Sequence, residues 1–82
     1  MGLPICIEKV DAAQERLLYA FGSPEDVVGY VRLNTATGDI ELVSLSEPAD
    51  GPDQRYYLAQ VVPRLQAFHD ETRYPDTAQW TA

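Results

Sequence analysis

The sequence predicts a small α+β fold, in which an antiparallel meander of three to four strands packs on one kinked C-terminal helix. Residues 27–33 and 40–45 are rich in β-branched and aromatic side chains and flank a turn sequence, which is typical of a β-hairpin. Residues 53–72 carry apolar side chains at helical spacing. At 82 residues and 9.1 kDa, the chain has room for one domain, which we expect to span residues 1–82.

The hairpin turn lies in residues 34–39, Asn-Thr-Ala-Thr-Gly-Asp. The Asn34 side chain can accept hydrogen bonds from the backbone of the turn, and Gly38 tolerates the left-handed conformation that closes it. The apolar pattern sets the register, because a slip by one residue would place Leu33 opposite Glu41. The predicted register pairs Leu33 with Ile40 and Val31 with Leu42 on one face, and Arg32 with Glu41, Tyr30 with Val43 and Val28 with Leu45 on the other.

The predicted helix over residues 53–72 has an unbroken apolar stripe at the spacing i, i+3, i+4, i+7. Pro52 suits the helix start, where its missing N–H costs nothing. Pro63 lies inside the helix, where a proline removes a backbone hydrogen bond and costs about 3 kcal/mol. Because the stripe continues through Pro63, the pattern predicts one kinked helix rather than two helices. The stripe consists of Leu58, Val61, Val62, Leu65, Phe68, His69 and Thr72.

Residues 12–21 fit two structures. Asp11 as an N-cap, followed by good helix formers, would give a helix and a β-α-β-β-α order of elements. The alternation of Leu17, Tyr19 and Phe21 instead indicates a strand. We favour the strand, because only a short loop then separates it from the next strand.

The segments near the two ends of the chain are shorter. Residues 4–10 are expected to form a strand with Ile5 and Ile7 on one face. Residues 74–80 are expected to form a turn and one short helical turn capped by Asp76.

The two faces of the predicted sheet differ in what covers them. The helix is expected to cover the face that carries Leu17, Tyr19, Phe21, Val27, Val31, Leu33, Ile40 and Leu42. The opposite face would carry Leu18, Ala20, Val28, Tyr30, Val43 and Leu45, with Arg32 and Glu41 at its rim. A solvated antiparallel face normally alternates to polar side chains, so an apolar face rimmed by charge indicates a contact with protein.

Aromatic side chains outside the hairpin add interface candidates. Tyr56 and Tyr57 are adjacent on the predicted helix and cannot both face the core, so at least one should be partly exposed. Trp80 is a residue type that anchors interfaces, although it would hold the tail down if it folded back over the core. The interface candidates are therefore Leu18, Val28, Tyr30, Val43, Leu45, Tyr56, Tyr57 and Trp80.

Composition argues against several classes of protein. Thirteen acidic and six basic residues give a formal net charge of −7, which opposes binding to nucleic acid. No apolar run approaches the roughly 18 residues of a membrane-spanning helix. A single cysteine, Cys6, and a single histidine, His69, form neither an intrachain disulfide nor a Cys/His zinc site. We expect a cytoplasmic protein that binds neither nucleic acid nor membrane.

His69, with Asp70 and Glu71 after it, is the one group that suggests catalysis. Neighbours at i+1 and i+2 on a helix do not face one another, so a packed histidine is the expected outcome. Cys6 lies in an apolar segment and is expected to be buried and inert. No catalytic, metal-binding or cofactor-binding residue is predicted.

These observations predict a non-enzymatic, acidic protein-interaction module. It would form a homodimer, or bind a protein partner, through the semi-apolar sheet face or a free sheet edge. Two alternatives stay open: an inhibitor or immunity-type protein that neutralises a basic partner, and a small enzyme centred on His69. If residues 12–21 were helical, that helix would cover one face of the sheet and weaken the case for a partner.

Overall fold

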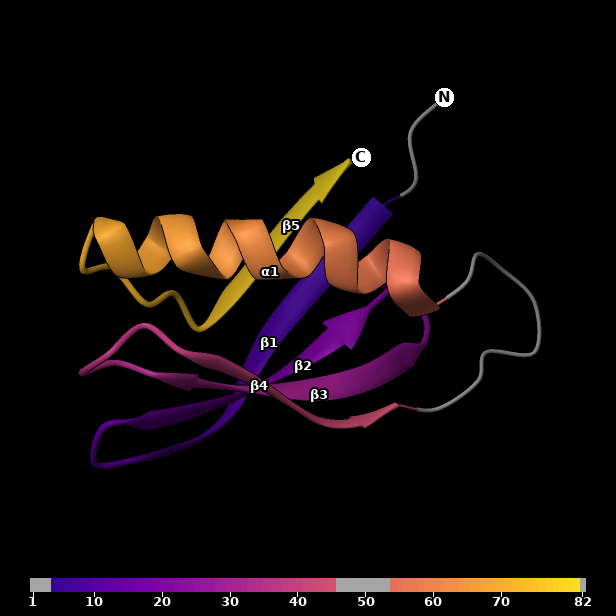
Figure 1. Ribbon diagram of the computed structural model, residues 1–82. Coiled ribbons are helices and arrows are strands. Elements are labelled where there is room, and N and C mark those ends of the chain that lie inside the picture. The colour runs from indigo at the N-terminus through magenta and orange to yellow at the C-terminus, as the bar shows by residue number, and fades with distance from the viewer. Residues whose placement is uncertain (1–3, 46–53, 82) are drawn as a thin grey trace.

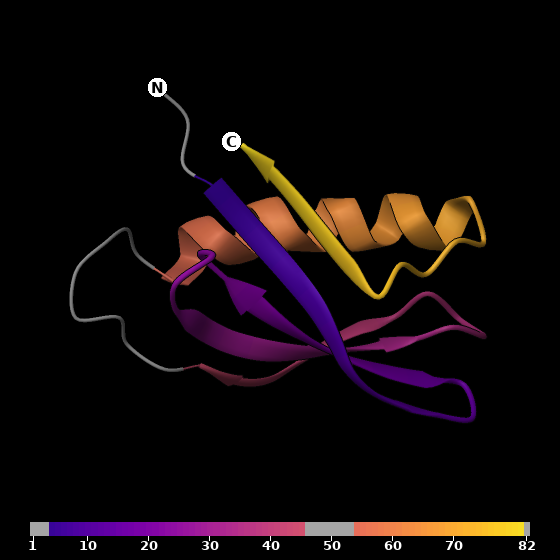
Figure 2. The same cartoon turned by 180° about the vertical axis from the view of Figure 1, so that it is seen from behind.

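The computed structural model describes residues 4–45 and 54–81, in which five strands and one helix form. The strands make one antiparallel sheet in the order β4-β3-β2-β1-β5, and the helix lies across one of its faces (Figure 1). Figure 2 shows the other face, with the strands in front of the helix. The predicted α+β class is confirmed, with one strand more than expected. The elements are β1 (Pro4–Ala13), β2 (Arg16–Gly22), β3 (Val27–Asn34), β4 (Ile40–Leu45), α1 (Gln54–Asp70) and β5 (Thr77–Thr81).

The strand interpretation of residues 12–21 is confirmed, because β2 begins at Arg16 and β1 already extends to Ala13. Leu17, Tyr19 and Phe21 are all buried beneath α1. In a helix, side chains two residues apart point about 200° apart, so only a strand places all three on one face. A two-residue turn, Gln14-Glu15, joins the strands.

The prediction of a helical turn near the C-terminus is wrong, because residues 77–81 form strand β5 beside β1. Ile5 of β1 pairs with Trp80 of β5. Lys9 binds the residue that precedes β5 in two ways: its backbone N–H donates to the Asp76 carbonyl at 2.7 Å, and its Nζ lies 3.0 Å from the Asp76 carboxylate. Ala78 and Trp80 pack against the core, so the short sequence Thr-Ala-Gln-Trp-Thr alternates as a strand should.

A register shift between β2 and β3 corrects the predicted positions of two valines. Phe21 pairs with Gly29, but the next residue, Gly22, pairs with Val27, so Val28 is an extra residue in β3. Such a bulge reverses which face the following side chains take. Val28 is therefore 1% exposed in the core, and Val27 is 51% exposed, the reverse of the predicted arrangement.

A second shift lies between β3 and β4. The predicted pairs of Leu33 with Ile40, Arg32 with Glu41 and Val31 with Leu42 are confirmed. The predicted pairs of Tyr30 with Val43 and Val28 with Leu45 are wrong: Tyr30 pairs with Ser44, and Gly29 with Leu45, which leaves Val43 as the extra residue.

This second bulge turns Leu45 to the helix side of the sheet. A Cβ on Gly29 would lie 2.9 Å from Phe21 Cζ and 3.0 Å from Leu45 Cδ2, so both side chains occupy the space that a side chain at position 29 would need. Phe21 belongs to the buried core beneath α1. Leu45 therefore lies at the margin of that core rather than on the opposite face.

The core lies between the sheet and α1. The helix contributes Tyr57, Val61 and Leu65, spaced four residues apart and at most 3% exposed. It runs through the exposed Pro63 as one helix, as predicted, whereas Pro52 lies outside the described residues. The sheet contributes Ile5, Ile7, Leu17, Tyr19, Phe21, Val28, Val31 and Leu33.

α1 ends two residues earlier than predicted, in a Schellman motif. The Thr72 N–H donates to the His69 carbonyl and the Arg73 N–H donates to the Phe68 carbonyl, both at 2.9 Å. Thr72 takes the left-handed conformation, with φ at 54°, that this motif requires. The chain then reverses toward β5. Within the described residues, α1 is too short and too polar to span a lipid bilayer.

Candidate functional site

Three of the five exposed large apolar side chains in the described residues lie on β4, at one edge of the sheet. Leu42 is 44% exposed, Val43 43% and Leu45 39%, and we call these three residues the β4 edge patch. In the described part of the chain, β4 pairs with β3 on one side, and no strand pairs with its other side. The N–H and C=O groups along that side face outward, as in any edge strand.

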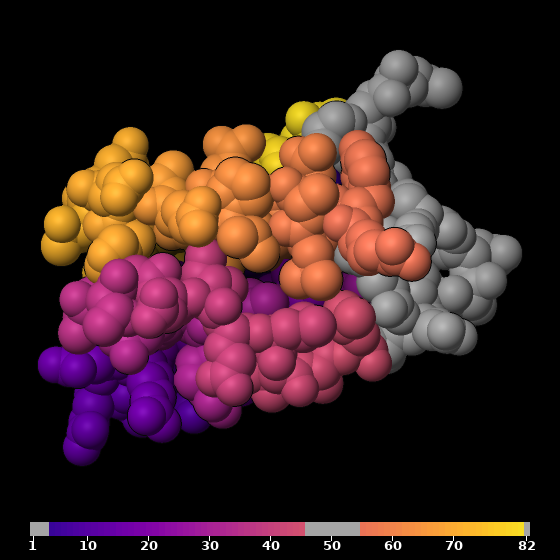
Figure 3. Space-filling model, viewed as in Figure 1, coloured from indigo at the N-terminus to yellow at the C-terminus, as the bar shows by residue number. Residues whose placement is uncertain are grey.

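The β4 edge patch is exposed because α1 does not cover β4. The helix packs on β1, β2 and β3. In Figure 3 the pink atoms of β4 lie at the surface beside the orange atoms of α1 rather than beneath them. Leu42 and Leu45 point to the helix side of the sheet, where α1 leaves them partly exposed.

Two contacts fix which flank of α1 faces β4. Arg64 lies over the Trp80 ring, on the β5 side, with Cζ 4.6 Å from the ring centroid. His69 packs against Gly38, in the hairpin that leads into β4. Leu58 and Val62 project within about 20–40° of His69 around the helix axis, so they share its flank. Leu58 and Val62, both half-buried, therefore lie on the flank of α1 that faces the β4 side of the sheet.

β4 carries few of the features that normally protect an edge strand. Edge strands are commonly protected by lysines, prolines or inward-pointing charges. The sequence of β4, Ile-Glu-Leu-Val-Ser-Leu, has neither lysine nor proline. Its one charge, Glu41, pairs with Arg32 at 3.4 Å across the strands, on the face away from α1. The bulge at Val43 is the one irregularity that interrupts the edge.

The sheet face opposite α1, which we call the open face, is less apolar than predicted. Leu18 and Tyr30 lie there half-buried, and Ala20, which is buried, pairs with Tyr30. Val28 and Leu45 are turned to the helix side by the two bulges. The outer half of this face is polar, because β1 and β5 contribute Cys6, Glu8, Thr77, Gln79 and Thr81.

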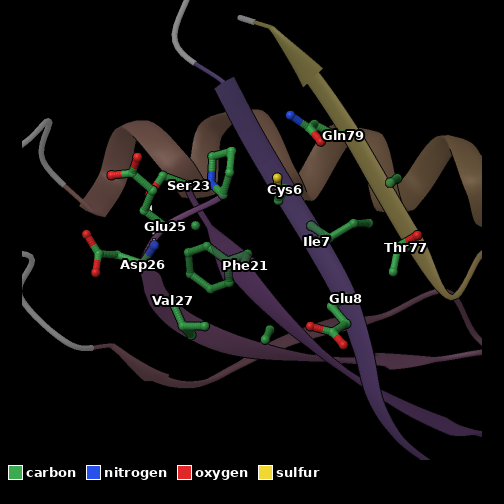
Figure 4. A pocket seen from close by; sticks show the side chains of 14 residues that line it. Cys6, Ile7, Glu8, Phe21, Ser23, Glu25, Asp26, Val27, Thr77 and Gln79 are labelled. Carbon is green, nitrogen blue, oxygen red and sulfur yellow. Dashed lines mark hydrogen bonds between the residues drawn. The ribbon is translucent and has the colours of Figure 1, made fainter.

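A cavity of about 490 Å³ lies on the open face, between β1 and the turn that joins β2 to β3 (Figure 4). Ser23 and Asp26 close that turn through the Ser23 N–H to the Asp26 carbonyl, at 3.0 Å, and the Asp26 N–H to Ser23 Oγ, at 3.1 Å. Cys6 is half-buried on this face rather than fully buried as predicted. Its partial burial raises the pKa of the thiol, which disfavours a reactive thiolate. The lining includes the carboxylates Glu8, Glu25 and Asp26 but no histidine or basic residue that would assist a nucleophile.

His69 is held in a structural contact on the helix side. Its Nδ1 lies 2.9 Å from the Tyr74 hydroxyl, and its ring rests on Gly38. Asp70 and Glu71 are exposed beside it. Among residues 4–45 and 54–81, no group of three His, Cys, Asp or Glu side chains is arranged to hold a metal ion.

The three aromatic interface candidates outside the hairpin pack within the chain. Tyr57 is 3% exposed, and burial raises its pKa, with the Asp26 and Tyr56 charges adding to the effect. Tyr56 is half-buried and packs edge-to-face against Tyr57, with ring centroids 6.2 Å apart. Trp80 packs against the core from β5. Of the predicted candidates, Val43 and Leu45 form most of the β4 edge patch, and Leu18 and Tyr30 stay on the open face.

Leu42 is the member of the β4 edge patch that the sequence pattern did not single out, because it belongs to the face that the helix was expected to cover. The signal that locates it is the position of β4 at the edge of the sheet, which follows from strand pairing rather than from local sequence.

Comparison of the chain with protein-family models, with curated proteins and with solved structures gave no match.

Proposed function

We propose that the chain is a non-enzymatic protein-interaction module that receives an extended strand from a partner at the free edge of β4. The observation that carries this proposal is the β4 edge patch on a strand with neither lysine nor proline. An added strand would satisfy the outward N–H and C=O groups by β-augmentation and would bury apolar side chains that lie 39–44% exposed.

The exposed apolar side chains of β4 favour a binding surface for a specific partner over a chance arrangement of exposed residues. Large apolar side chains that are scattered singly on a surface need no explanation, but Leu42 and Leu45 share the helix side of one six-residue strand, and Val43 is exposed on the same strand. The adjoining flank of α1, with Leu58 and Val62, would receive the partner's side chains on the helix side. The main contact surface in this proposal is the free edge of β4 rather than the open face of the sheet.

The test is to place a lysine on the edge. We expect Val43→Lys to abolish association, because a lysine on an edge strand discourages strand addition. Ser44→Lys, at an exposed and already polar position, should do the same with little risk to folding. Val10→Lys is the matched control, since Val10 is 48% exposed on β1, away from β4.

Each tagged variant is expressed at an equal level in the cells of origin, and the proteins crosslinked to it are purified and compared. Sedimentation velocity of the purified chains then measures whether each variant associates with itself. An association retained by wild type and Val10→Lys but lost in both β4 variants supports the proposal. If all four chains capture the same proteins and sediment alike, strand addition at β4 is wrong. Circular dichroism and thermal unfolding establish that the variants remain folded.

A further inference from the structure

We propose that the strand received by β4 is an extended, basic segment of a partner protein, with Lys or Arg on its open-face side and at its ends. This inference rests on the proposed function and adds the chemistry of the occupant. Three features carry it: the charge around β4, the two different sides of the strand, and the repulsion that a second copy of the chain would meet.

The sequence around β4 contains acidic residues but no basic ones. Residues 33–54 contain five acidic residues and no Lys, Arg or His. Within the described residues, Asp39 precedes β4 and Glu41 lies in it. The Glu41 side chain is 71% exposed although it pairs with Arg32. A strand laid along β4 would therefore meet carboxylates before and within the edge, and charge complementarity favours a basic partner.

The two sides of β4 call for different side chains in an added strand. Leu42 and Leu45 lie on the helix side, because they pair with Val31 and Gly29. Glu41 lies on the open face, opposite Arg32. Side chains in an added strand also alternate between the two faces. The matching segment therefore alternates, with apolar residues toward Leu42 and Leu45 and a Lys or Arg beside Glu41.

A second copy of the chain fits this edge less well. Pairing of β4 with the β4 of a second copy would add that copy's Asp39 and Glu41 to an edge that already carries the same two carboxylates. Each copy also carries a net charge of −7, which opposes self-association. Like charges directly opposed across paired strands are destabilising.

The test uses two synthetic peptides with the same core of alternating Val and Thr. In one peptide, the flanks and one Thr position of the core carry lysine, and in the other peptide the same positions carry glutamate. Each is titrated into the isotope-labelled full chain, and backbone amide shifts are followed by NMR. We expect the Lys-flanked peptide to shift the amides of β4 and to bind about tenfold more tightly than the Glu-flanked peptide at low salt. The difference should shrink as salt screens the charges.

A pair of matched variants assigns the charge effect to the edge. Glu41→Gln should weaken the Lys-flanked peptide by about twofold to fivefold, the range of one exposed ion pair. Glu8→Gln removes a carboxylate from the open face of β1, three strand spacings or about 14 Å from β4, and should leave binding unchanged. Equal effects of the two variants would overturn the inference.

The remaining outcomes separate this inference from the proposed function. If both peptides bind β4 equally well, the inference that the partner segment is basic is wrong, whereas the proposal of strand addition at β4 is supported. If neither shifts β4 but the chain sediments as a dimer that Val43→Lys disperses, the occupant is a second copy, and again only this inference fails. If the Lys-flanked peptide instead shifts the residues around the cavity beside Glu8, the inference is wrong as to place.

Discussion

The Tyr19 hydroxyl donates a hydrogen bond of 2.8 Å to the Pro75 carbonyl, which joins the centre of the sheet to the connection between α1 and β5. Tyr19 is fully buried, and its partner lies 56 residues later in the chain. The side chain therefore holds the reversal that delivers β5 to the sheet edge. Burial, with the Asp76 and Tyr74 charges, raises the pKa of Tyr19 to about 12.

Tyr19→Phe should destabilise the fold by about 1–2 kcal/mol at neutral pH, because the Pro75 carbonyl loses its donor. The raised pKa adds a pH dependence. Ionisation of Tyr19 favours the unfolded chain, so its contribution is complete below pH 10 and is lost as the pH rises to about 12.

The measurement is urea unfolding of both chains between pH 8 and about 11.5. The difference in unfolding free energy should narrow above pH 10. Taking the difference between the two chains cancels the titration of Tyr57, whose pKa is also raised. A difference that stays constant or widens would contradict the assignment.

Thr72→Gly should stabilise the fold by about 1 kcal/mol, because Thr72 holds a left-handed φ of 54° at the end of α1. A β-branched residue is strained there, and glycine relieves that strain while the Schellman hydrogen bonds remain. Thermal unfolding checks the gain. Thr77→Gly is the control, because this exposed threonine lies in extended β5, where glycine should be neutral or destabilising.

The sequence predicted the parts of the fold that are specified locally. Asn34 accepts hydrogen bonds from the N–H groups of Ala36 and Thr37, and Gly38 has a φ of 81°, as the hairpin prediction required. The pairs nearest this turn, from Leu33 with Ile40 to Val31 with Leu42, also follow from it. The turn sets the register only until the first bulge interrupts it.

The two bulges and β5 were not predictable from the same local reasoning. Val27 and Val28 are equally apolar, so the pattern does not show which of them faces the core. Residues 77–81 alternate over too few positions to outweigh the turn signals of Tyr74, Pro75 and Asp76, and β5 is decided by pairing with β1, which is distant in the sequence. For the same reason, two of the predicted interface residues on the sheet, Val43 and Leu45, belong to an exposed edge rather than to a face.

Gly38→Ala should destabilise the fold by about 1–2 kcal/mol, through its positive φ and through contact with His69. A Cβ there would lie 2.7 Å from His69 Cδ2, a distance that requires the ring to move. In the His69→Ala background that ring is absent, so Gly38→Ala should cost less than in the wild type. Denaturant unfolding of the four chains gives the coupling, and strictly additive costs would show that the ring does not confine position 38.

Arg64 and Trp80 should be coupled by about 0.5–1 kcal/mol, because the guanidinium carbon lies 4.6 Å from the ring centroid and the pair joins α1 to the outermost strand, β5. A double-mutant cycle with Arg64→Ala and Trp80→Leu isolates this coupling, since leucine keeps apolar bulk but removes the π face. Arg16→Ala with Trp80→Leu is the matched control: Arg16 pairs with Ala13 and Trp80 with Ile5, at opposite ends of β1, so their effects should add. Equal coupling in the two cycles would mean that Arg64 does not act through the ring, and β5 would then be held by its pairing with β1 and its packing on the core.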